Sequence, residues 1–94
     1  GCCDWGKEAH LVKQTVDVLA VFDVGALHPR PIKFKYLERG LKQTVNIDRI
    51  LNVEWIGSGY VTRIVYECAT PMNGRLITYR LSYYYKESKW IFEK

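Results

Sequence analysis

The chain has 94 residues, of which 48% are hydrophobic and 26% are charged, and its formal net charge is +4. This length excludes an enzyme built from two domains with a cleft between them, and the composition excludes a disordered segment. The positive charge is uneven, because residues 30–94 carry twelve basic and six acidic side chains. Such a basic field attracts phosphates, anionic lipid or an acidic partner, although it also serves solubility alone.

The composition favours a β-sheet. Val, Ile, Thr and the aromatic residues together make up 34 of the 94 residues, and these types prefer strands. No apolar run approaches the roughly 18 residues that a membrane helix needs, so no membrane span is expected. Cys2 and Cys3 are adjacent and Cys68 lies in an expected strand, which argues against a disulfide framework. We therefore predict a reduced, cytoplasmic setting.

Residues 1–14 differ from the rest of the chain. Asp4 could cap a short helix over residues 5–13, with Leu11 facing inward, although Gly6 weakens this interpretation. We predict an N-terminal arm or short helix over residues 1–14 and a single β domain over residues 15–94.

The first two strands follow from alternation. Residues 16–23 place four apolar side chains on one face, namely Val16, Val18, Ala20 and Phe22. Residues 25–31 are expected to form a turn region, because two prolines and a glycine do not fit a paired ladder. Residues 32–36 then alternate, with the inward set Ile32, Phe34 and Tyr36 and the solvent-facing pair Lys33 and Lys35.

After a turn at residues 39–40, residues 43–56 are predicted to form one long strand with a bulge or sharp bend near Arg49 and Ile50. Its expected inner face holds Val45, Ile47, Leu51, Val53 and Trp55. Residues 61–69 and 76–85 are predicted to form a hairpin in which Asn73 and Gly74 supply positive φ. A second hairpin through residues 86–89 leads to a last strand over residues 90–92.

Consecutive short strands joined by tight turns predict an antiparallel meander. A long strand with a central bulge lets a small sheet curl toward a barrel. We therefore predict a mainly β fold: a strongly bent antiparallel sheet of five or six strands, with the short helix or arm beside it.

Four segments carry a resemblance to a known family: residues 16–22 followed by Asp23 and Gly25, residues 31–34, residues 47–51 and residues 89–93. Over residues 16–94 the chain resembles small β-rich domains of unknown function from Gram-positive bacteria. The chain departs from the family pattern at Tyr36 and Gly25. The resemblance implies a fold and a bacterial, cytoplasmic origin, and it implies no activity.

No group of residues points to catalysis, a metal ion or a cofactor. The Cys and His residues lack the short paired spacing of a metal site, and no Ser lies in a recognisable nucleophile motif. Asp48 and Glu54 are six residues apart on one expected strand, which separates their carboxylates by about 20 Å. This distance is too long for the two groups to act as a catalytic pair. We predict that the protein is not an enzyme and has no cofactor.

Basic residues interleaved with aromatic residues suggest a surface for nucleic acid. Small curved sheets bind single strands by stacking bases on aromatic rings and contacting phosphates with Lys and Arg. The candidate residues are Lys33, Lys35, Arg63, Arg75, Arg80 and Tyr84. On the strand over residues 76–85, however, parity places Tyr79, Tyr83 and Tyr85 in the core and only Tyr84 outside.

Three tryptophans have different expected roles. Trp55 and Trp90 are predicted to anchor the core, with a partner contact as the alternative for either. Trp5 lies on the arm and is the candidate for a contact with the sheet or with another subunit. The favoured hypothesis is a small non-enzymatic interaction module that binds a protein partner, a second copy of the chain included. The alternative is a nucleic-acid-binding small β-barrel.

Overall fold

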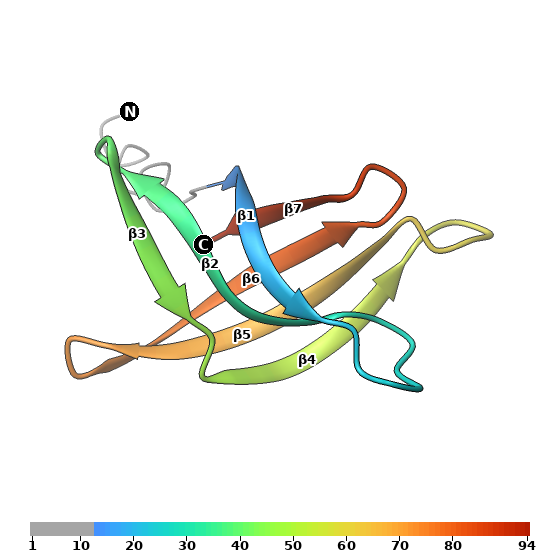
Figure 1. Cartoon of the computed structure of the whole chain (residues 1–94), viewed down its shortest axis with the longest axis horizontal. Coiled ribbons are helices and arrows are strands. Elements are labelled where there is room, and N and C mark those ends of the chain that lie inside the picture. Colours follow the sequence, from blue (N-terminus) through green and yellow to red (C-terminus); the bar gives the residue numbers. More distant parts are fainter. Residues whose placement is uncertain (1–12) are drawn as a thin grey trace, which may run out of the picture.

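The computed structural model describes residues 13–94, which form one antiparallel sheet (Figure 1). The seven strands are β1 (Lys13–Val21), β2 (Arg30–Glu38), β3 (Leu41–Asn46), β4 (Arg49–Ile56), β5 (Arg63–Met72), β6 (Arg75–Tyr84) and β7 (Lys89–Glu93). Their order in the sheet is β3-β2-β1-β7-β6-β5-β4, and the sheet curls into a half-barrel. The prediction of a mainly β, strongly bent antiparallel sheet is confirmed, with seven strands instead of five or six.

The start of the domain differs slightly from the prediction. Strand β1 begins at Lys13, two positions before the predicted boundary at residue 15, so Lys13 belongs to a strand and not to the predicted helix. The remainder of that helix falls within residues 1–12, outside the described part of the chain. No helix between residues 13 and 94 is long and apolar enough to cross a membrane.

The predicted long strand over residues 43–56 is wrong, because the chain breaks at Ile47 and Asp48 into β3 and β4. These two strands lie at opposite edges of the sheet. The amide of Ile47 donates a hydrogen bond to the carbonyl of Ile32 at 2.9 Å, which holds the crossing segment against β2. A bulge does occur, between Ile50 and Asn52, and as a result Leu51 is exposed instead of facing the core as predicted.

Pro31 also departs from the prediction, since it lies inside β2 and is fully buried. The pairing of β1 with β2 shifts at this point: Leu19 faces Lys33, whereas Ala20 faces Pro31. A proline lacks the amide hydrogen that a regular ladder needs, and the irregular register at this position accommodates it. The predicted alternation of Phe34 inward with Lys33 and Lys35 outward is confirmed.

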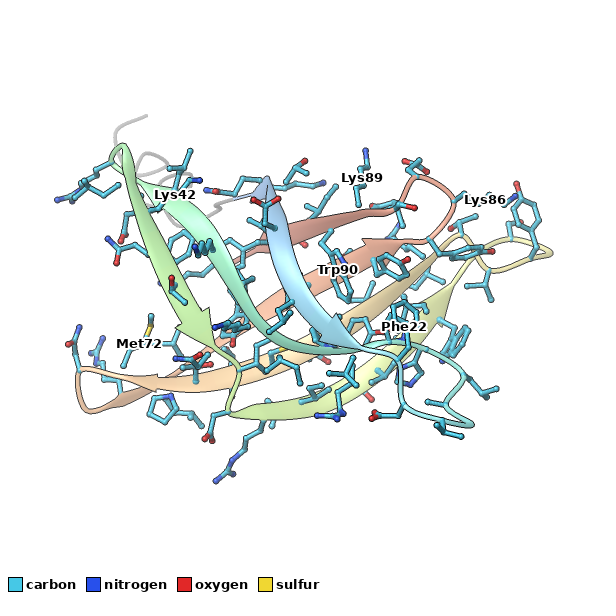
Figure 2. All side chains as sticks on the ribbon, in the orientation of Figure 1. Phe22, Lys42, Met72, Lys86, Lys89 and Trp90 are labelled. Carbon is cyan, nitrogen blue, oxygen red and sulfur yellow. The ribbon has the colours of Figure 1, made fainter. Side chains whose placement is uncertain are left out.

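The core lies inside the curl and consists largely of aromatic rings. Phe34 packs against Phe92 with ring centres 5.0 Å apart, and Tyr83 stacks on Trp90 at 4.6 Å. Figure 2 shows Trp90 inside the curl, and its side chain is buried as predicted. Tyr79 and Leu81 face inward on β6 as predicted, whereas Tyr85, which was also predicted to lie in the core, follows the end of β6 and is exposed. Offset and tilted ring pairs of this kind add stabilisation beyond the area they bury.

Tyrosine hydroxyls connect the two sides of the half-barrel. Tyr66 on β5 donates to the carbonyl of Pro29, just before β2, at 2.5 Å. Tyr79 on β6 is 2.6 Å from the hydroxyl of Thr70, which donates to the carbonyl of Asn46 at the end of β3 at 2.8 Å. Burial raises the pKa of Tyr79 from its ordinary value of 10 to about 12 despite the opposing effect of the Thr70 hydrogen bond, so the buried phenol resists ionisation even in alkaline solution.

Strand β1 joins the two parts of the sheet because its two halves pair with different strands. Its first residues, up to Val16, pair with β7, and those from Asp17 onward pair with β2. Where β2 separates from β1, the side chain of Gln14 makes the hydrogen bonds that the backbone of β1 no longer makes to β2. Its Oε1 atom accepts from the backbone amide of Leu37 at 2.7 Å, and its Nε2 atom donates to the Leu37 carbonyl at 3.0 Å. The bend at β1 therefore costs no backbone hydrogen bond at Leu37.

We predict that Tyr66→Phe lowers the free energy of unfolding by about 1–3 kcal/mol, because it removes the hydroxyl that donates to the buried carbonyl of Pro29 and leaves only the longer contact of that carbonyl with Nδ1 of His28, at 3.2 Å. Urea unfolding followed by circular dichroism would measure the change. Tyr84→Phe is the matched control, since Tyr84 faces outward and no hydrogen bond of its hydroxyl is seen in the described region. Equal losses for the two variants would contradict the proposed role of the Tyr66 hydroxyl.

Candidate binding site

One end of the half-barrel holds an apolar pocket of about 350 Å³, which we call the mouth pocket. It is formed by the β1–β2 loop, the end of β4, the start of β5 and the end of β6. Its main aromatic and apolar lining residues are Phe22, Leu27, His28, Trp55, Tyr83 and Tyr85. Among the described residues around it, none is Asp, Glu, Lys or Arg. The pocket therefore suits an uncharged, apolar group.

His28 joins the pocket to the core. Its ring meets Trp55 and Tyr66 edge-on, with 5.6 Å between ring centres in both pairs. Its Nδ1 atom lies 3.4 Å from the Tyr66 hydroxyl, and burial raises the pKa of that phenol. The hydrogen bond from Tyr66 to the Pro29 carbonyl thus holds the end of the β1–β2 loop against β5, and it positions the neighbouring His28 in the wall of the pocket.

Trp55 lies on the inner face of β4, as predicted, but it does not complete the core. Its side chain remains 43% exposed because β4 is the edge strand and no further strand of the described region lies beside it. This places a large aromatic ring at the entrance of the mouth pocket. Such half-exposed tryptophans are frequent anchors of protein interfaces.

The β1–β2 loop presents apolar side chains to solvent. Phe22 is 71% exposed, Leu27 is 85% exposed and Val24 is fully exposed. Phe22 was predicted to share the inner face of β1, but the strand ends at Val21, opposite Arg30, so nothing covers the next position. Figure 2 shows Phe22 beside the end of β1.

An ion pair holds this loop in place. The guanidinium of Arg30 donates to both carboxylate oxygens of Asp23, at 2.8 and 3.1 Å, and its hydrogen bond lowers the pKa of Asp23. The amide of Ala26 donates to the carbonyl of Asp23 at 3.1 Å, and Gly25 supplies a φ of +79° for the turn. The loop is therefore ordered before it meets any partner, which reduces the entropy lost on binding.

The predicted basic residues fall into separate places. Lys33 and Lys35 share the outer face of β2 and line, with Lys42 of β3, a shallow hollow of about 280 Å³, which we call the lysine hollow. Asp17 is the carboxylate that lines it. The outward direction predicted for Lys33 and Lys35 is confirmed. Lys42 was not among the predicted site residues, and the pairing of β2 with β3 brings it to the hollow.

Arg63 and Tyr84 form a second cluster with Lys89, on the outer face of β5, β6 and β7. The guanidinium carbon of Arg63 is 5.8 Å from the centre of the Tyr84 ring, and the Lys89 nitrogen is 5.5 Å from it. The predicted outward direction of Tyr84 is confirmed. The ring already interacts with two cations of its own chain, which leaves it less available for stacking on a base.

Arg80 and Arg75 stand apart from both clusters. In the register of the sheet, Arg80 lies between Glu67 on β5 and Glu93 on β7. Arg75 begins β6 next to the Asn73–Gly74 turn. The six predicted nucleic-acid contacts therefore do not form one continuous basic track, and Trp5 lies outside the described residues.

The described residues hold no group of three or more His, Cys, Asp and Glu side chains that could bind a metal ion. Cys68 is buried in the core, as predicted, and burial raises the pKa of its thiol to about 12. A thiol of this kind is a poor nucleophile because the thiolate is the reactive form.

Comparison with known proteins adds no further constraint: no family model, no curated protein and no solved structure matches the chain.

We predict that Cys68 does not react with an aromatic disulfide reagent at pH 8 in the folded protein, because its thiol is buried and stays protonated. The measurement uses the Cys2→Ser/Cys3→Ser variant, so that Cys68 is the single thiol of the chain. The same variant in denaturant gives the control rate. Comparable rates in the two conditions would show that the core opens readily.

Proposed function

We propose that this domain is a non-enzymatic interaction module that binds a protein partner through the mouth pocket. The observation that carries the proposal is the exposed aromatic pocket without Asp, Glu, Lys or Arg in its described lining. Ordinary surfaces of monomeric proteins seldom keep large apolar side chains together at one end. Here Trp55, Phe22 and Leu27 surround a concavity that accepts an apolar side chain of the partner.

Two features favour a protein partner over a passive surface. The Asp23–Arg30 ion pair orders the loop that carries Phe22 and Leu27, so the contact surface is formed in advance. Trp55 is held edge-on against His28, which is itself fixed by the Tyr66 hydroxyl. Rigid aromatic anchors beside a preformed pocket are the residues that dominate binding energy at protein interfaces.

The alternative function, nucleic-acid binding, has weaker support in the geometry. The positive charge of Arg80 is balanced by Glu67 and Glu93 in register, and the Tyr84 ring is engaged by Arg63 and Lys89. A titration of the amide NMR spectrum with mixed-sequence oligonucleotides tests this alternative directly. Salt-sensitive shifts at Lys33, Arg63 and Arg80 would support it.

The protein-binding proposal is tested by panning a displayed library of random linear peptides on the folded domain. We expect enriched peptides to contain an apolar anchor and to lose at least about tenfold in affinity on Trp55→Ala, because truncation of a central aromatic anchor costs about 2 kcal/mol or more. Titration calorimetry with the synthesised peptides measures the loss.

Leu27→Ser provides a variant that leaves the core untouched, since Leu27 is exposed, and we expect it to weaken the same peptides. Arg75→Gln, far from the pocket along β6, is the matched control and should leave affinity unchanged. Failure to enrich any peptide, or enriched peptides that bind Trp55→Ala and Leu27→Ser as tightly as the unmodified domain, would overturn the proposal. Sedimentation of the domain alone would show whether a second copy is the partner.

A further inference from the structure

We propose that the outer face of β1 and β2, together with the β1–β2 loop, lies on an anionic lipid surface. This contact is separate from the proposed protein-binding function and does not rest on it. It would hold the domain flat against the surface of a bilayer without crossing it, with apolar side chains in the interface and lysines among the headgroups.

The apolar part of this surface lies mainly along the second half of β1 and the loop that follows it. Leu19 and Val21 point outward from β1 and are substantially exposed, and Val24 in the loop is fully exposed. Leu37, also exposed, points outward from the far end of β2, beyond Lys35. Exposed aliphatic side chains are costly in water and gain free energy on entering a lipid interface.

The charged part borders the apolar part in the register of the sheet. Leu19 faces Lys33 across the β1–β2 pairing, and Leu37 faces Lys42 across the β2–β3 pairing. Lys33, Lys35 and Lys42 all line the lysine hollow, where Asp17 supplies the opposing carboxylate. The hollow therefore keeps an excess of positive charge, which complements the negative charge of phosphatidylglycerol or phosphatidylserine headgroups.

The interleaving of the two residue types favours lipid over an acidic protein. In a bilayer the anionic headgroups lie directly above the apolar chains, so a surface that meets it needs cations and aliphatic groups side by side. Lysine suits this arrangement because its long aliphatic stem covers apolar surface while the ammonium group reaches the headgroups. The bidentate Asp23–Arg30 pair neutralises both of its charges, so the loop that carries Val24 brings no net charge into the interface.

The experiment is co-sedimentation of the domain with phosphatidylcholine vesicles that do or do not contain phosphatidylglycerol. We expect binding to the anionic vesicles at low salt, a decrease as salt is raised, and little binding to pure phosphatidylcholine. Lys35→Gln should lower the partition coefficient about fivefold, the effect of one lysine close to an anionic surface. Val24→Ser should also lower it, because a fully exposed valine contributes only when the loop enters the interface.

Arg75→Gln is the matched control for charge, since it removes one positive charge at the distant β5–β6 turn and should leave the partition coefficient unchanged. Trp55→Ala separates the two proposals: it should weaken peptide binding at the mouth pocket at least about tenfold and leave vesicle binding intact. No binding to anionic vesicles at low salt would overturn the inference. Equal losses for Lys35→Gln and Arg75→Gln, or an unchanged partition coefficient for Val24→Ser, would also overturn it.

Discussion

The fold depends on the hydrogen bonds that buried hydroxyls make to backbone carbonyls across the open side of the half-barrel. Among residues 13–94, β3 and β4 form the two edges of the sheet and do not pair with each other to close it. Tyr66 connects β5 to Pro29, and Thr70, supported by Tyr79, connects β5 to Asn46. Each bond satisfies a carbonyl that strand pairing leaves free, so the aromatic core stays enclosed although the ladder is incomplete.

This way of closing the barrel explains why its mouth remains open. A fully paired barrel would place another strand beside β4, whereas among residues 13–94 the edge strand β4 pairs with β5 alone and His28 of the β1–β2 loop packs against the Trp55 ring. The ring of Trp55 is therefore held on its inner side and free at the entrance. The candidate binding pocket is thus a direct consequence of an open sheet whose two sides are joined by side chains.

Local pattern was sufficient to predict the faces of most strand residues and the antiparallel pairing of strands adjacent in sequence, but not the break between β3 and β4. The alternation around Phe34 and the Asn73–Gly74 turn depend on neighbours in sequence, and both are confirmed. The division of residues 43–56 into two strands depends on β3 pairing with β2 and β4 pairing with β5, which is a property of the whole sheet. The mouth pocket was missed for the same reason, because its walls come from three distant segments. A usable signal was the apolar run that continues past β1 to Leu27.

Charge pairing across the sheet distinguishes the two outer regions that carry basic residues. On β7, β6 and β5, cross-strand neighbours alternate in sign, with Arg80 between Glu93 and Glu67, so the field largely cancels. Around the lysine hollow, one carboxylate opposes three lysines: Lys35 faces Asp17 on β1 and Thr44 on β3, whereas Lys33 faces Leu19 and Asn46. An excess of positive charge therefore remains over the lysine hollow. That hollow borders the exposed aliphatic side chains of β1, which makes this region, and not the rest of the sheet, suited to an anionic surface with an apolar interior.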